Sequence, residues 1–179
     1  MHVMQSHFEL FGLPPAFAVE TDALERSYRE IQSKVHPDRF AHAGDAERRA
    51  SLQWTTRVNE AFQILKNPVK RAKHLLELHG VDVAFETNTA MPPEFLMQQM
   101  ELRETLEEAR DAAALDALRK ALRKEKSGIE QQIGDLIDRK HDYAGAAGLV
   151  RKLQFLDRLD EEIDAAYEEI DSMEPKRLG

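Results

Sequence analysis

The sequence contains no cysteine among its 179 residues. This absence excludes disulfide bonds, cysteine-ligated zinc and a thiol nucleophile. It also leaves the chain without the thiolates that hold most iron–sulfur clusters. If the protein serves iron–sulfur chemistry, a cysteine-held cluster must therefore sit on a partner molecule.

Glycine and proline are scarce, with 8 and 7 residues, while 42% of the residues are hydrophobic and 32% are charged. This composition favours a helical protein of one or two domains. No apolar run approaches the ~20 residues of a membrane-spanning helix. The N-terminal residues have neither the basic and apolar regions of a signal peptide nor the composition of a transit peptide. We therefore expect a cytoplasmic, prokaryotic-type protein without membrane contact.

The net charge of −8 is unevenly divided along the chain. Residues 1–80 hold 11 Lys and Arg against 10 Asp and Glu, whereas residues 81–179 hold 14 against 23. Two halves with such different surfaces suggest two partners. Overall acidity argues against nucleic acid as a partner, because phosphate binding needs a concentrated basic face. One basic run is interpreted as a solvated helix face, and it consists of Arg119, Lys120, Arg123, Lys124 and Lys126.

Helical periodicity dominates the sequence, and no stretch has a convincing strand pattern. Thr21 is predicted to cap the first long helix, which must end by His36 because Pro37 disfavours helical geometry in the residue before it. A polar loop over residues 36–45 then leads to a second long helix, which ends before Pro68. We expect these two helices to form an antiparallel pair.

Small helices are predicted at each end of this pair. A short apolar helix or turn covers residues 8–15, and another helix covers about residues 69–79 before Gly80. The apolar stripes that would join the long helices consist of Leu24, Tyr28, Ile31 and Val35 on the first, and Trp54, Val58, Ala61, Phe62 and Leu65 on the second.

The second half of the chain is predicted to form a three-helix bundle, because three amphipathic stretches follow one another with short connections. These stretches cover about residues 94–110, 113–142 and 144–173. The stripe of the last one consists of Leu149, Leu153, Leu156, Ile163, Tyr167 and Ile170.

The predicted fold class is therefore all-α with two domains. Residues 1–80 form the antiparallel pair with its small helices, and residues 94–179 form the bundle. Residues 81–93, which include Pro92 and Pro93, are interpreted as the linker between them.

The loop sequence His36-Pro37-Asp38 is the sharpest local feature. One interpretation is an enzyme in which His36 is a general base oriented by Asp38. Residues two apart in a proline-constrained loop are poorly placed for that hydrogen bond, and no Ser, Cys or glycine-rich phosphate loop accompanies them. Taken alone, the three residues are also compatible with a polar loop that has no role.

The surrounding residues favour a different interpretation. Tyr28 lies eight residues before His36, and the motifs FELFGL at 8–13, NEAFQIL at 59–65 and NPVKRA at 67–72 occur in order. With these motifs, residues 1–80 closely resemble a J-domain. The resemblance implies that His36, Pro37 and Asp38 contact a DnaK-type ATPase chaperone and trigger ATP hydrolysis. It also implies docking on an acidic surface of that chaperone by Arg26, Arg29, Lys34 and Arg39.

The sequence after residue 80 narrows the family. It has no Gly/Phe-rich tract and no cysteine-containing zinc repeat, which excludes the generic DnaJ layout. A J-domain followed by an acidic three-helix bundle is similar to HscB-type co-chaperones of iron–sulfur cluster assembly. The segments RAKHLLELHG at 71–80, FLMQQMELRETLE at 95–107 and VRKLQFLD at 150–157 extend this resemblance over nearly the whole chain.

The HscB resemblance implies a regulator rather than an enzyme. Such a protein stimulates the ATPase of an HscA-like chaperone and delivers an IscU-like iron–sulfur scaffold protein to it, which promotes maturation of iron–sulfur proteins. We expect no resident cofactor, metal site or catalytic residue. A J-domain co-chaperone for a different client is the main alternative.

The helix after Pro93 carries two apolar stripes. Phe95, Leu102 and Leu106 lie on the stripe expected in the core, whereas Leu96, Met97 and Met100 lie roughly opposite. A helix packed on one side needs no second apolar stripe, so the alternatives are a protein-binding patch and scattered surface residues. The resemblance places the scaffold-binding surface on Leu96, Met97, Met100, Glu101, Glu104, Glu108 and Phe155.

Overall fold

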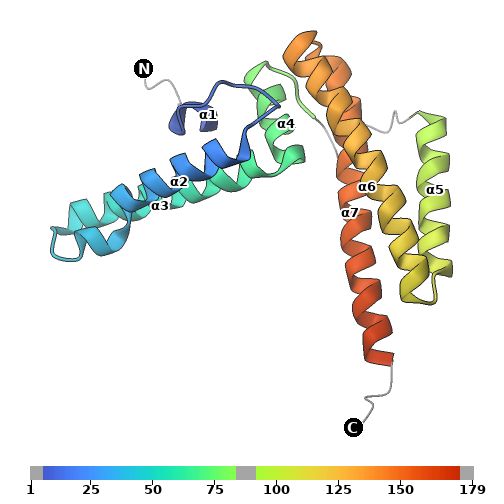
Figure 1. The fold of residues 1–179 in the computed structure, drawn as a ribbon. Coiled ribbons are helices and arrows are strands. Elements are labelled where there is room, and N and C mark those ends of the chain that lie inside the picture. The colour runs from blue at the N-terminus through green and yellow to red at the C-terminus, as the bar shows by residue number, and fades with distance from the viewer. Residues whose placement is uncertain (1–5, 84–91, 174–179) are drawn as a thin grey trace.

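The computed structural model describes residues 6–83 and 92–173, and every regular element in these ranges is helical. This confirms the all-α prediction (Figure 1). In chain order the elements are α1 (His7–Leu10), α2 (Thr21–Val35), the 3-10 turn η1 (Pro37–Phe40), α3 (Asp45–Lys66), α4 (Pro68–Leu78), α5 (Pro93–Glu108), α6 (Ala112–Gly134), the π-helical turn η2 (Asp135–Arg139) and α7 (Tyr143–Met173). Among these helices none combines the length and apolar character that a membrane crossing requires.

Helices α2 and α3 form a long antiparallel pair, with η1 in the connection at the end far from the other helices (Figure 1). The predicted stripe of α2 faces α3, because Leu24 is buried and Tyr28 is half-buried against the core. The ring of Tyr28 stacks on Phe62 with centroids 4.0 Å apart, and its hydroxyl donates to Asn59 at 2.7 Å. Packing and hydrogen bonding thus fix the two helices in register.

Two details of the predicted pair were wrong. Thr21 is the first residue of α2, and the N-cap is Glu20, whose side chain makes no capping hydrogen bond. Trp54 is 43% exposed, with the guanidinium of Arg57 5.3 Å from its ring centroid. The inward stripe of α3 runs through Ser51 and Thr55, so Trp54 lies at its edge, where the indole packs against a cation at the surface.

Helix α7 packs against both α6 and α5 in the bundle. Asp111 caps α6 by accepting the N–H of Ala114 at 2.8 Å, and Pro93 occupies the first turn of α5, where its missing N–H costs nothing. The buried contact surface consists of Leu115, Leu118, Leu122, Ile129 and Ile133 on α6, and Val150, Leu153, Leu156, Leu159 and Ile163 on α7.

The helix predicted over residues 113–142 changes character before its end. Helix α6 stops at Gly134, and the N–H of Lys140 donates to the carbonyl of Asp135 at 3.0 Å, a spacing of five residues. Such π-turns are rare and shift the direction of the side chains that follow. Here the turn brings Asp138 to the chain segment before α2.

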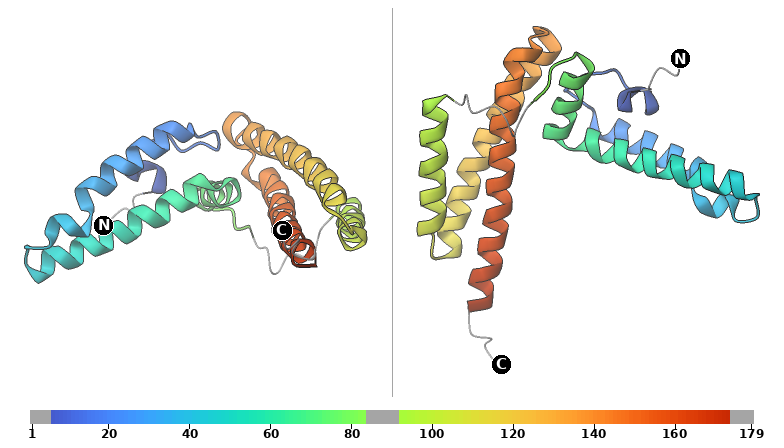
Figure 2. Two further views of the ribbon diagram at one scale, coloured as in Figure 1. Left: turned by 60° about the horizontal axis from the view of Figure 1, so that its bottom comes forward. Right: turned by 180° about the vertical axis from the view of Figure 1, so that it is seen from behind.

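The two halves of the chain share one hydrophobic core. Helix α4 packs on α7, while the α2–α3 pair extends away from the bundle (Figure 2). Val83, within the segment predicted as linker, is 2% exposed, and the N–H of Val81 donates to Leu76 at 2.9 Å. The remainder of that segment, residues 84–91, lies outside the described residues.

Candidate functional site: the loop after α2 and the outer face of α5

The loop after α2 is a tight turn built around Pro37. His36 has φ −57° and ψ 134°, the extended conformation that a following proline demands. Its carbonyl accepts the N–H of Arg39 at 3.0 Å, and its Nδ1 accepts the N–H of Asp38 at 3.2 Å. The side chain of Asp38 is left 93% exposed. The turn therefore presents one carboxylate to solvent in a fixed direction.

His36 and Asp38 come closer than their sequence spacing led us to expect, with Nδ1 and Oδ2 3.5 Å apart. This distance does not make them a catalytic pair. Because Nδ1 accepts a backbone hydrogen, the proton of the neutral ring sits on Nε2. In the known triads, the carboxylate that orients a general-base histidine instead accepts a hydrogen bond from its Nδ1–H. Both side chains also point into solvent rather than into a cleft.

The four cations predicted to dock on a chaperone are all exposed. Arg29 lies 4.0 Å from Glu25, and Lys34 lies 3.2 Å from Glu30, so these two carry intrahelical partners. Arg39 donates to the carbonyl of Ser33 at 3.2 Å and so covers one of the unpaired carbonyls at the end of α2. Arg26 makes no ion pair within the described residues. The structure thus places all four cations on or beside α2. They differ in whether the side chain already has a partner within the protein.

The outer face of α5 is apolar and solvent-accessible. Leu96, Met97 and Met100 are 44%, 63% and 72% exposed, whereas Phe95 on the opposite face is 7% exposed. The carboxylates of Glu101, Glu104 and Glu108 are exposed on the same helix. Flexible, polarisable methionines on an exposed helix face are typical of protein-binding surfaces.

Phe155 of α7 lies beside α5 and is only half-buried. Its ring meets Phe95 edge-on, with centroids 5.8 Å apart, and the guanidinium of Arg103 lies 5.5 Å from its centroid. Arg103 in turn is held by Glu162 at 3.0 Å. Arg103 was not predicted as part of this surface, although its position in the helix, seven residues after Leu96, would have indicated it.

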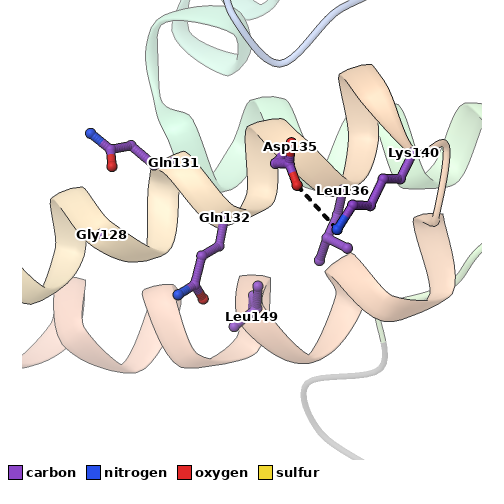
Figure 3. A pocket seen from close by; sticks show the side chains of 7 residues that line it. All are labelled: Gly128, Gln131, Gln132, Asp135, Leu136, Lys140 and Leu149. Atoms are coloured by element: carbon purple, nitrogen blue, oxygen red, sulfur yellow. Dashed lines mark ion pairs between the residues drawn. The ribbon is translucent and has the colours of Figure 1, made fainter.

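A shallow hollow of about 500 Å³ lies elsewhere, between α6, η2 and α7 (Figure 3). Its lining includes Gln132, Leu136 and Leu149, and the carboxylate of Asp135 pairs with Lys140 at 3.3 Å. Its two ionisable lining residues, Asp135 and Lys140, are thus paired with each other. Across residues 6–83 and 92–173, moreover, no group of three or more His, Asp or Glu could hold a metal ion.

Comparisons with known proteins point to one family. A family model described as the HSCB C-terminal oligomerisation domain matches residues 91–164. The co-chaperone protein HscB homolog of Azoarcus sp. (strain BH72) is 48% identical over 173 residues, covering 95% of this chain and 98% of that protein. The homolog of Burkholderia thailandensis is 52% identical over 169 residues, covering 93% and 96%. The chain belongs to the HscB co-chaperone family.

Solved structures of HscB proteins have the same architecture. Chaperone HscB from Vibrio cholerae is 35% identical, with a TM-score of 0.82, and covers 92% of this chain and 99% of its own. The human co-chaperone protein HscB is 26% identical, with a TM-score of 0.89, covering 93% and 84%. The predicted family and fold class, an N-terminal J-domain joined to a C-terminal helical bundle, are thereby confirmed. The co-chaperone name of these relatives supports a regulator rather than a catalyst.

Proposed function

We propose that this HscB-family protein stimulates the ATPase of a specialised, HscA-like DnaK-type chaperone and delivers an IscU-like iron–sulfur scaffold to it. The proposal rests on one observation: a single chain carries a rigid, exposed His36-Pro37-Asp38 turn and, on a separate helix, an exposed apolar face. The delivery promotes maturation of iron–sulfur proteins. Because the curated relatives are bacterial, we place this activity in the cytoplasm.

The loop has the properties of a trigger. Pro37 fixes the backbone before binding, so little ordering entropy is lost when a partner engages Asp38. An exposed carboxylate accepts charge-assisted hydrogen bonds from a partner arginine. The cations of α2 steer the encounter with an acidic chaperone surface more than they add affinity, and Arg26, which lacks an intrahelical partner, contributes most to steering.

The outer face of α5 has the properties of a cargo surface. Leu96, Met97 and Met100 together offer an apolar strip that the bundle does not need for its own packing. The surrounding carboxylates favour a scaffold with a complementary basic rim. Arg103 lies on α5 beside the half-buried ring of Phe155, and the two residues extend the proposed surface from α5 to α7.

The loop and the outer face of α5 belong to one chain, so both partners can bind the same molecule. The J-domain and the bundle share one core, so a scaffold bound at α5 travels with the loop that engages the chaperone. Binding through one surface raises the local concentration at the other. Delivery and triggering of hydrolysis then occur in the same complex.

The decisive experiment is an ATPase assay of the HscA-like chaperone with the full chain, with and without scaffold. We expect strong stimulation by the wild type, a further increase with scaffold, and no stimulation by Asp38→Asn. The matched control is Asp22→Asn, which alters an exposed carboxylate at the other end of α2. Equal stimulation by Asp38→Asn and the wild type would refute the role of the loop.

Scaffold binding is tested by calorimetry. The variant Leu96→Ala/Met97→Ala/Phe155→Ala should lose most of its affinity for the scaffold, whereas Met173→Ala, which alters an equally exposed methionine at the end of α7, should bind as the wild type does. Unchanged binding by the triple variant would favour a different client. Turnover of a substrate by the purified chain alone would favour an enzyme that uses His36 and Asp38.

A further inference from the structure

The carbonyl oxygen of Val35, the last residue of α2, is held by two side chains of α3. The hydroxyl of Ser51 donates to it at 2.6 Å, and the hydroxyl of Thr55 donates to it at 3.2 Å. Ser51 is 4% exposed. Among the described residues, it is the one polar residue that is buried. Two hydroxyls from one helix thus converge on a single atom at the entrance of the loop.

Among the residues that the structure describes, no backbone N–H donates to this carbonyl. The last four carbonyls of an α-helix lack the N–H groups that continuation of the helix would supply. Pro37 has no N–H, and the N–H of Arg39 turns back to the carbonyl of His36. A partly buried carbonyl left unpaired costs free energy, and the hydroxyls of Ser51 and Thr55 replace the missing helical donors.

The held atom belongs to the peptide group that joins Val35 to His36. Because a peptide group is planar, fixing its oxygen also fixes the direction in which the His36 nitrogen leaves α2. The following residues are then set by Pro37 and by the two local hydrogen bonds that His36 accepts from Asp38 and Arg39. The direction in which the loop leaves α2 is therefore fixed by hydrogen bonds from α3 as well as by α2 itself.

We propose that Ser51 and Thr55 are positioning residues that aim the His36-Pro37-Asp38 turn at the partner chaperone. They touch no partner atom themselves and act through the Val35–His36 peptide. This inference rests on the proposed function of the loop. It predicts that docking through the cations of α2 persists when the hydroxyls are removed, while triggering of ATP hydrolysis weakens.

The test compares Ser51→Ala/Thr55→Val, which removes both donors, with Ser51→Ala/Thr55→Ser, which restores one. In the ATPase assay the first variant should lower the maximal stimulation by about three- to tenfold, the effect of losing one to two hydrogen bonds. The concentration for half-maximal stimulation should change by less than about twofold, since steering depends on charge. The second variant should recover part of the maximum.

The matched control is Thr56→Val on the same helix, because the Thr56 hydroxyl donates to the Leu52 carbonyl of its own helix at 2.9 Å. This variant should stimulate as the wild type does. NMR amide resonances supply a readout that stability alone would not move: those of His36, Asp38 and Arg39 should shift and broaden in Ser51→Ala/Thr55→Val, while those of α5 stay in place.

The outcomes separate the two ideas. If the wild type fails to stimulate the chaperone, the proposed function is wrong. If the wild type stimulates and a folded Ser51→Ala/Thr55→Val variant stimulates equally, the inference about positioning is wrong. Should the double variant fail to fold, Ser51→Ala and Thr55→Val are measured singly. Each should lose part of the maximal stimulation, and wild-type maxima in both would overturn the inference.

Discussion

The carboxylate of Asp138 in η2 accepts the backbone N–H of Phe17 at 2.8 Å, although the two residues are 121 positions apart. Its second oxygen accepts the N–H of Ala18 at 3.0 Å. From the other side, Nε of Arg71 donates to the Phe17 carbonyl at 2.7 Å, with the guanidinium 4.8 Å from the ring centroid. Burial lowers the pKa of Arg71, and the charges of Glu130 and Asp138 oppose that shift. The segment before α2 is thus clamped between α4 and the bundle.

This clamp predicts a measurable loss of stability in Asp138→Ala. Two backbone donors would lose a charged acceptor, so the free energy of unfolding should fall by about 1.5–3 kcal/mol in urea denaturation followed by circular dichroism. Asp135→Ala is the matched control in the same turn. Its carboxylate pairs with Arg139 and Lys140 at the surface, so we expect a loss below about 1 kcal/mol. Equal losses in the two variants would contradict the clamp.

The helices of this protein could be predicted from the sequence because their signals are local. The stripe of Leu24, Tyr28 and Ile31 and the stop before Pro37 are both set by residues within a few turns of one another. Helical periodicity also placed Trp54 in the core, because a pattern search assigns large apolar side chains to the buried face. The inward positions were taken by Ser51 and Thr55, whose hydroxyls meet a carbonyl of another helix.

The contact between J-domain and bundle could not be predicted in this way. Besides the packing of α4 on α7, it includes the carboxylate of Asp138, which has no distinguishing sequence pattern and meets Phe17 from within the π-turn that follows α6. No periodicity marks a π-turn, and no local pattern pairs residues more than a hundred positions apart. By contrast, the positions proposed for partners were accessible to sequence reasoning, since the exposed Leu96, Met97 and Met100 follow from the helical period alone.

The two faces of α5 should respond differently to truncation. Phe95 is buried against Phe155, so Phe95→Ala should lower the free energy of unfolding by about 3–5 kcal/mol. Met97→Ala and Met100→Ala remove exposed side chains and should change it by less than about 0.5 kcal/mol, while weakening scaffold binding. Urea denaturation and calorimetry on the same samples measure both effects. A large loss of stability in the methionine variants would show that this face packs within the protein.

Two glycines of the bundle should respond differently to substitution by alanine. A Cβ at Gly128 in α6 would meet no atom of the described residues within 4 Å, so Gly128→Ala should raise the free energy of unfolding by about 0.5–1 kcal/mol. A Cβ at Gly145 would collide with the carboxylate of Asp142, which accepts the Gly145 N–H at 2.9 Å at the start of α7.

Gly145→Ala must therefore displace this cap, which costs about 1 kcal/mol and outweighs the helical preference of alanine. Thermal melting of the two variants beside the wild type gives the comparison, with Gly128→Ala expected above and Gly145→Ala at or below the wild type. If both variants melt higher by the same amount, Asp142 is not acting as a cap.

Acid should loosen the attachment of α1 through His74. The N–H of His7 donates to Nε2 of His74 at 3.4 Å, and the ring of His74 stacks on Phe8 with centroids 5.7 Å apart. Burial, followed by the charge of His7, lowers the pKa of His74 from 6.5 to about 4, and burial also lowers the pKa of His7. A protonated Nε2 can no longer accept the His7 N–H, so protonation and docking of α1 oppose each other.

The sign of the pH effect follows from that shift. The unfolded chain takes up the proton near the ordinary pKa of 6.5 and the folded chain only near 4, so the stability contribution is intact above pH 6.5 and is lost as the pH falls toward 4. Because the ring is partly exposed, the loss is on the order of 1–2 kcal/mol. His74→Gln keeps an acceptor and removes the titration, so its unfolding free energy should fall less between about pH 7.5 and about pH 5. His42→Gln, at an exposed histidine, should keep the wild-type pH dependence, and identical pH dependence in all three proteins would exclude His74 as its source.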